Sequence, residues 1–137
     1  MKLAKTISIC RAGQLTKAQK TEAIALGKRL VPNDVPELLN LVALQDGKVI
    51  GVLYADAKAA PAVIHVIGVH PAKQRLGIGK QLVAEFEKQM DFLGIAEFEV
   101  DCTTEASQKL FESSGFVFNG KHGAKPAWEI ANNVERL

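Results

Sequence analysis

One part of the chain constrains the fold more than any other: a nearly continuous apolar run, Ala62–Val69, leads into a helical pattern and then into a second strand. The helical pattern runs from about Gly77 to Leu93, and its buried stripe comprises Leu82, Phe86, Met90 and Leu93. The second strand is predicted over Ala96–Cys102, where the acidic residues Glu97, Glu99 and Asp101 alternate with Phe98, Val100 and Cys102. Two strands joined by a helix form a parallel pair with a right-handed connection. Because Ala62–Val69 is apolar at almost every position, we expect both of its faces to be covered.

The chain before this segment predicts antiparallel strands. Asp46-Gly47 separates two apolar runs, Leu39–Gln45 and Lys48–Ala55, and such a dipeptide between strands is the strongest short hairpin signal. A further strand, rich in β-branched residues, is predicted over Lys5–Cys10.

A helix is predicted between the first strand and the hairpin. Thr16 is followed three residues later by Gln19, which is a capping-box pattern, and Pro32 sets the far limit of the helix. Its predicted core side chains are Ala23, Leu26 and Leu30. Val31–Pro36 is expected to be a loop.

The last third of the chain predicts a short helix over Ser107–Ser114, stopped by a glycine, and a strand over Phe116–Phe118. Lys121–Pro126 is expected to be a loop, and Trp128–Ile130 a final strand. The order of elements predicts a mixed α/β fold whose first half is antiparallel, in a single domain over residues 1–137.

Composition excludes several classes of protein. The 137 residues carry 17 basic and 15 acidic side chains, and a net charge of +2 gives no reason to expect a nucleic-acid partner. No apolar run has the roughly 18 residues of a membrane span, and the first residues do not resemble a signal peptide, so we expect a cytoplasmic protein without a membrane partner. Cys10 and Cys102 have no metal-ligand spacing, so neither a disulfide framework nor a metal site is predicted.

The most informative segment is the junction between the apolar strand and the long helix. Gly77 and Gly79 lie where the helix begins, and free backbone N–H groups at a helix start attract anions. Lys73, Arg75 and Lys80 add positive charge, and no acidic residue occurs between Ala57 and Ala84. The junction therefore predicts an anion site, although a flexible strand-to-helix turn explains two glycines equally well.

Two motifs in this region resemble the GNAT superfamily of acyl-CoA-dependent N-acetyltransferases. The family pattern V-x-P-x-x-[Q/R]-x-x-G-x-[G/A] matches Val69, Pro71, Gln74, Gly77 and Gly79. The pattern N-x-x-A-x-x-[L/F]-Y-x-x-x-G-F aligns with Thr104, Ser107, Leu110, Phe111, Gly115 and Phe116. The resemblance extends from about Leu39 to Ile130.

The resemblance implies a GNAT-like mixed, mostly antiparallel sheet of about six or seven strands, with helices on both faces and a central parallel pair splayed for acetyl-CoA. Acetyl-CoA would be the acyl donor, and no metal is expected. Backbone N–H groups of Arg75 through Lys80 would hold its pyrophosphate, and its pantetheine arm would pair with the preceding strand. The implied cofactor-binding residues are Ile67, Gly68, Val69, Gln74, Arg75, Leu76, Gly77, Ile78, Gly79, Lys80, Thr104, Ser107 and Phe111.

Catalysis of amine acetylation needs a group that accepts a proton from the attacking amine. His65, in the middle of the strand, is the first candidate, since some members of the family carry a histidine there; a buried structural histidine is the alternative. Glu99 and Asp101 are second candidates, and with Glu97 they form either an acidic wall for a cationic acceptor or a solvated strand face. His70 is expected to be a solvent-facing loop residue.

The chain departs from the family pattern at Phe111, where the usual tyrosine protonates the departing thiolate. The resemblance therefore implies either N-acetyl transfer to a primary amine of a small molecule or protein by direct attack, or a non-catalytic acyl-CoA-binding module. Acceptor recognition would come from Ala18–Pro36 and Gly120–Pro126, and a homodimer is possible, as in other members of the family.

Overall fold

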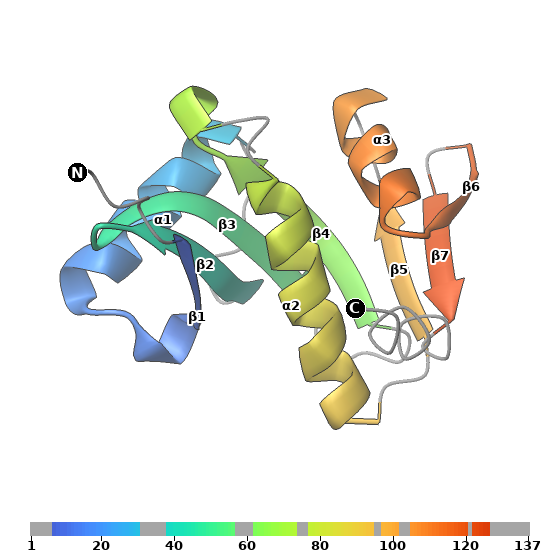
Figure 1. Cartoon of the computed structure of the whole chain (residues 1–137), viewed down its shortest axis with the longest axis horizontal. Helices are drawn as coiled ribbons and strands as arrows, with labels where there is room; N and C mark the ends of the chain where they lie inside the picture. Colours follow the sequence, from blue (N-terminus) through green and yellow to red (C-terminus); the bar gives the residue numbers. More distant parts are fainter. Residues whose placement is uncertain are drawn as a thin grey trace, which may run out of the picture. The chain divides into compact units, whose positions relative to one another are not determined.

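A computed structural model of the chain describes residues 7–30, 38–56, 62–73, 77–94, 97–101, 105–120 and 122–126 (Figure 1). The chain divides into two compact units. The first comprises Met1–Tyr54 and Val66–Leu82, and the second comprises Ala55–His65 and Val83–Leu137. Strand β4 (Ala62–Val69) and helix α2 (Ile78–Phe92) each pass from one unit into the other. The single domain expected over residues 1–137 stays a prediction.

The strands of the first unit follow the order β1-β2-β3-β4. Strand β2 (Leu39–Gln45) pairs antiparallel with β1 (Ile7–Arg11) and with β3 (Lys48–Asp56). The two-residue turn between β2 and β3 has positive φ at both Asp46 (54°) and Gly47 (76°), which matches the twist of a tight hairpin. The predicted antiparallel first half is therefore confirmed.

Helix α1 (Lys17–Leu30) begins at the predicted capping box. The backbone N–H of Gln19 donates to Thr16 Oγ1 at 3.1 Å, and the backbone N–H of Thr16 donates to Gln19 Oε1 at 3.0 Å. Ala23 and Leu26 are buried as predicted; the side chain of Leu30 lies outside the described part of the structure. A short 3-10 helix, η1 (Ala12–Gln14), precedes α1.

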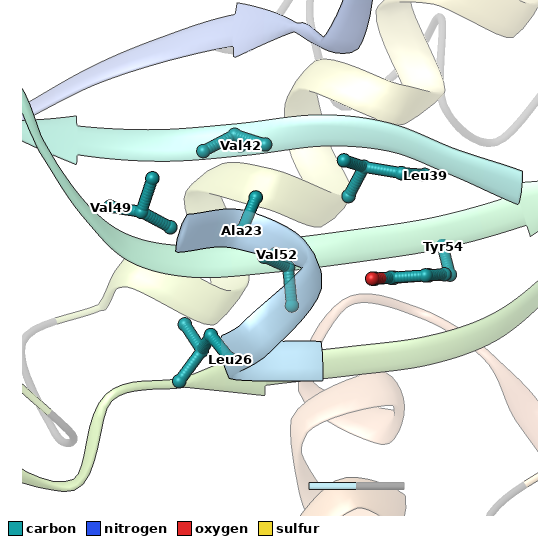
Figure 2. Packing of buried hydrophobic residues seen from close by; sticks show 7 residues of the cluster. All are labelled: Ala23, Leu26, Leu39, Val42, Val49, Val52 and Tyr54. Atoms are coloured by element: carbon teal, nitrogen blue, oxygen red, sulfur yellow. The ribbon is translucent and has the colours of Figure 1, made fainter. Parts of the chain in front are cut away.

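Two helices cover opposite faces of β3 in this unit. Figure 2 shows the α1 side, where a cluster of buried side chains comprises Ala23, Leu26, Leu39, Val42, Val49, Val52 and Tyr54. On the other side, a Cβ added at Gly51 would lie 3.1 Å from Ile78 and 3.2 Å from Leu82, both in α2. Gly51 and Val52 are consecutive residues of the strand, so they face opposite sides of the sheet. The predicted helices on both faces of the sheet are confirmed at β3.

The strands of the second unit follow the order β4-β5-β7-β6. Strand β5 (Glu97–Asp101) pairs parallel with β4, from Ala62 opposite Phe98 to Ile64 opposite Val100. Strand β7 (His122–Pro126) pairs antiparallel with β5 and with β6 (Val117–Asn119). The seven described strands thus form the expected mixed, mostly antiparallel arrangement with one parallel pair.

The second half of α2 and helix α3 (Glu105–Ser113) complete the second unit. Phe86 and Met90 are fully buried, and the ring of Phe86 meets that of Phe98 edge-on at 6.2 Å between centroids. Helix α3 begins two residues earlier than predicted. Among the described residues, none of the helices combines the length and the apolar character of a membrane span.

Three predictions about the fold are wrong. Residues 121–126 were expected to form a loop, but His122–Pro126 is strand β7, so little of the expected acceptor loop Gly120–Pro126 is loop. Gly120, with φ of 67°, makes the tight turn from β6, and Gly123 packs so closely on the ring of Phe118 that a Cβ would lie 2.6 Å from it. Leu93, placed in the buried stripe, follows the end of α2 and is 57% exposed.

The third wrong prediction concerns the cover of β4. Ala62, Ile64 and Gly68 are buried, whereas alternate positions are half-buried or exposed, so one face only is fully covered. The expected loop over Val31–Pro36 and the expected strand over Trp128–Ile130 lie outside the described residues.

Candidate functional site

The segment that leaves β4 is held by three hydrogen bonds at His70, all within the first unit. The backbone N–H of His70 donates to the carbonyl oxygen of Ile50 on β3 at 2.8 Å. The N–H of Lys73 donates to the carbonyl oxygen of His70 at 2.8 Å, which closes the 3-10 turn η3 (Pro71–Lys73). Nδ1 of His70 accepts from the N–H of Ala72 at 3.1 Å. His70 lies between β4 and η3, as expected of a loop residue, and it is half-buried where it caps the turn.

Gly77 is the residue at which α2 starts. Its φ of 78° is in the left-handed region that favours glycine, and a Cβ there would meet no atom within 4 Å. The N–H of Gln81 donates to its carbonyl oxygen at 3.0 Å, the first bond of the helix. The N–H groups of Ile78, Gly79 and Lys80 therefore belong to the first turn, where α-helical geometry supplies no acceptor.

The start of α2 is fixed in place by its own apolar side chain. Ile78 is 1% exposed and lies over Gly51, where the lack of a side chain lets the helix approach β3 closely. Gly79 is also buried, and Lys80 beside it is exposed. The first turn of α2 has no acidic side chain, so the helix dipole and Lys80 act together on an anion.

Some predicted cofactor residues are not placed. Gln74, Arg75, Leu76 and Thr104 lie outside the described residues, and Ser107 lies in α3 with its side chain undescribed. On β4, Gly68 is buried, whereas Ile67 and Val69 are half-buried. The expected pairing of the pantetheine arm with this strand stays a prediction.

In the second unit, the parallel pair brings two candidate bases to one face. Glu99 is half-buried and lies opposite Val63, and His65 follows Val63 by two residues, which puts His65 and Glu99 on the same side of the pair. His65 is exposed, so the alternative of a buried structural histidine is wrong. Asp101 lies two residues beyond Glu99 on β5, with its side chain undescribed.

Phe111, at the position of the family's tyrosine, is part of the cap of α3. The N–H of Phe116 donates to the Phe111 carbonyl oxygen at 3.0 Å, and the N–H of Gly115 donates to that of Glu112 at 3.0 Å. With φ of 98° at Gly115, this is a Schellman cap, and its apolar contact is the edge-on pair of Phe111 and Phe116 rings at 5.3 Å. The Phe111 side chain is 2% exposed, so other residues of the protein cover nearly all of its surface.

Other side chains with reactive chemistry lie elsewhere. Tyr54, the one tyrosine of the chain, is 1% exposed in the cluster beneath α1. Cys10 on β1 is a free, half-buried thiol. Within the described ranges, no three His, Cys, Asp or Glu side chains gather as metal ligands would.

Sequence reasoning missed the contribution of β3 to the junction. Ile50 and Gly51 hold the two ends of the segment between β4 and α2, one by a hydrogen bond and the other by close packing. A single glycine inside an apolar strand was the available signal, since it indicates that another part of the chain approaches closely.

Comparisons with known proteins identify the family. The model of the acetyltransferase (GNAT) family matches residues 14–116. The structure of the ribosomal-protein-S18-alanine N-acetyltransferase from Escherichia coli is similar with a TM-score of 0.70 and 19% identity, over 89% of this chain and 94% of that chain. An aminoglycoside 6'-N-acetyltransferase complexed with coenzyme A has a TM-score of 0.76 and 14% identity, over 88% and 97%.

A GNAT family acetyltransferase from Brucella melitensis in complex with acetyl-CoA has a TM-score of 0.66 and 18% identity, over 88% of each chain. At these identities the likeness to solved structures shows the fold. Among curated proteins none matches the chain. Because the family match covers well over half of the sequence and includes β4, the glycine junction and all of α3, the chain belongs to the GNAT acetyltransferase family.

Proposed function

We propose that this protein is an acetyl-CoA-dependent N-acetyltransferase that acetylates a primary amine by direct attack. The observation that carries the proposal is the start of α2: a glycine in the left-handed conformation, a basic and acid-free first turn, and a buried Ile78 that anchors the helix to β3. This segment lies inside the part of the chain that matches the family.

In the proposed complex the first-turn N–H groups of Ile78, Gly79 and Lys80 donate to the pyrophosphate of acetyl-CoA. The helix dipole and the exposed Lys80 add favourable charge. The pantetheine arm runs beside β4 at Ile67 and Val69. The group itself supplies an acetyl thioester, and the protein supplies its orientation.

In the proposed reaction the neutral amine nitrogen attacks the thioester carbonyl carbon, a C–N bond forms, and the C–S bond breaks. The proton lost by the amine passes to His65, with Glu99 on the same strand face as the second candidate. The CoA thiolate leaves and takes a proton from water, because Phe111 has none to give. The products are an N-acetylated amine and CoA.

The acceptor of the proposed transfer is a primary amine of a protein or of a small molecule. The names of two similar structures describe transfer to an alanine of a ribosomal protein and to an aminoglycoside. Both kinds of amine are therefore candidate acceptors of the acetyl group.

Calorimetric titration with acetyl-CoA and CoA, with ATP as comparison ligand, tests the proposal. At about 100 times its dissociation constant, a ligand stabilises the fold by about 2.7 kcal/mol, so thermal unfolding gives a second readout. Gly77→Ala should weaken acetyl-CoA binding at least about tenfold, because alanine disfavours the left-handed conformation that opens α2.

The other end of the same helix offers a matched control. Gly94 has φ of 74° and, like Gly77, no atom within 4 Å of an added Cβ. Gly94→Ala should cost similar stability and leave acetyl-CoA binding within about twofold. Equal loss in both variants, or no binding of any CoA species, would refute the proposed cofactor site. Tight binding without thiol release for any amine would instead favour a non-catalytic acyl-CoA-binding module.

A further inference from the structure

The side chain of His70 forms a contact that the proposed reaction does not use. Its Nδ1 accepts a hydrogen bond from the N–H of Ala72, two residues ahead, at 3.1 Å. Pro71 occupies the first position of the short helix η3, where the missing N–H of proline costs nothing. His70 therefore stands as the N-cap of this turn, in the place usually taken by Ser, Thr, Asp or Asn.

This hydrogen bond defines the chemical state of the imidazole. An Nδ1 that accepts a hydrogen bond carries no proton, so the neutral ring has its proton on Nε2. The bond from a side-chain acceptor to the N–H two residues on is the one that an Asn or Asp makes in an Asx turn. In Asn, Oδ1 is bonded to Cγ just as Nδ1 is in His, so Asn can replace the acceptor. In Gln the oxygen lies one carbon further out.

The turn lies between two anchored points in the first unit. At one end the His70 N–H is bonded to Ile50; at the other, Ile78 packs over Gly51. The turn Pro71–Lys73 follows the first anchor directly and leads toward the second, so an ordered turn reduces the number of ways in which the backbone can approach the first N–H groups of α2. Loss of the cap frees the Ala72 N–H and lets the turn sample other conformations, which acetyl-CoA must then reorder on binding.

We propose that His70 is a positioning residue for acetyl-CoA: through its Nδ1 cap on Ala72 it preorganises the segment that leads to the cofactor-binding turn. This role rests on the proposed function, because it assumes that acetyl-CoA binds at the start of α2. It concerns ground-state binding, so KM and the dissociation constant for acetyl-CoA change while kcat does not.

The experiment compares three substitutions in the full chain by calorimetry with CoA and by steady-state thiol release. His70→Ala removes the acceptor and should raise the dissociation constant and KM about five- to tenfold, with kcat within about twofold. His70→Asn restores the acceptor and should lie within about twofold of the unchanged protein. His70→Gln should behave like His70→Ala. Thermal unfolding of each variant separates a loss of fold from a loss of binding.

Nitrogen NMR on histidine-labelled protein measures which ring nitrogen of His70 carries the proton. A role in packing alone would not require a particular nitrogen to be protonated. At about pH 8, the ring signal that disappears in His70→Asn should show a bare Nδ1 and a protonated Nε2. A protonated Nδ1 would overturn the proposal. So would unchanged CoA binding in His70→Ala, or a loss in His70→Asn as large as in His70→Ala. If the unchanged protein binds no CoA species, the proposed function fails first and this role fails with it.

Discussion

The carbonyl oxygen of Ile50 accepts a hydrogen bond from the backbone N–H of His70 at 2.8 Å, which ties the end of β4 to β3 one residue before Gly51. Gly51 in turn lies beneath Ile78 and Leu82 of α2. Two consecutive residues of one strand therefore locate both ends of the turn that leads into the helix. The position of the helix start depends on β3 as much as on the glycines of the turn.

Gly51→Val should displace the start of α2. An added Cβ already lies 3.1 Å from Ile78, 3.2 Å from Leu82 and 3.4 Å from Ala43, and the two further methyl groups of valine have no room beyond it. We expect a loss of about 2 kcal/mol in the free energy of unfolding and a rise of about tenfold in the dissociation constant of acetyl-CoA. Urea unfolding and calorimetric titration measure the two effects.

Gly27→Ala is the matched control. Gly27 lies in α1, the helix that covers the other face of β3. Its Cβ would approach the Tyr54 ring, with Cζ at 2.8 Å, so it should also destabilise by about 1–3 kcal/mol. The affected cluster lies under α1 and does not include Ile78 or Leu82. Cofactor binding by the folded variant should stay within about twofold. An equal loss of binding in both variants would mean that stability alone explains the effect of Gly51→Val.

Lys80→Glu should weaken acetyl-CoA binding about tenfold or more at low salt, because it puts a negative charge in the first turn of α2 beside the bound phosphates. Lys88→Glu makes the same charge change two turns later. Lys88 is exposed and has a long contact of 4.0 Å with Glu85, which contributes little. Lys88→Glu should therefore leave the dissociation constant of acetyl-CoA within about twofold of that of the unchanged protein. The difference between the variants should shrink as salt is raised.

His65→Gln should lower kcat about a hundredfold with little change in KM for acetyl-CoA. The side chain is exposed, so the free energy of unfolding should change by no more than about 0.5 kcal/mol. Glu99→Gln and Asp101→Asn test the other two candidates and should each lower kcat by less than about threefold. If Glu99→Gln lowered kcat more than His65→Gln does, Glu99 on β5 would be the base instead of His65.

The sequence predicted well those elements whose determinants are local. The run Ala62–Val69 coincides with β4, and Leu39–Gln45 with β2, because turn residues bound each apolar run. The capping box at Thr16 involves groups only three residues apart. Such signals do not depend on the rest of the fold.

The same reasoning failed where distant residues decide. His122–Pro126 contains a glycine and a proline and has low β-propensity, yet it forms β7 because β5 and β6 offer it partners on both sides. At the site, Gly77 was recognisable from its motif, whereas the contribution of Gly51 comes from a contact with α2, more than twenty residues away along the chain. Local pattern reading cannot detect such a contact.

Phe111→Ala should destabilise the protein by about 3–5 kcal/mol, because the ring is 2% exposed and packs edge-on against Phe116 across the cap of α3. A double-mutant cycle with Phe116→Ala should give a coupling of about 0.5–1.5 kcal/mol. Urea unfolding of the single and double variants measures it.

Two further variants separate the cap from general packing. Gly115→Ala keeps both rings but disfavours φ of 98°, so it should cost about 1–2 kcal/mol. Val117→Ala, next to Phe116 but 73% exposed, should change stability by no more than about 0.5 kcal/mol. Full additivity of Phe111→Ala and Phe116→Ala would show that the rings do not act as a pair. Phe111, at the position of the family's tyrosine, is one member of that pair. The contribution of Phe111 to stability can therefore be measured without any turnover.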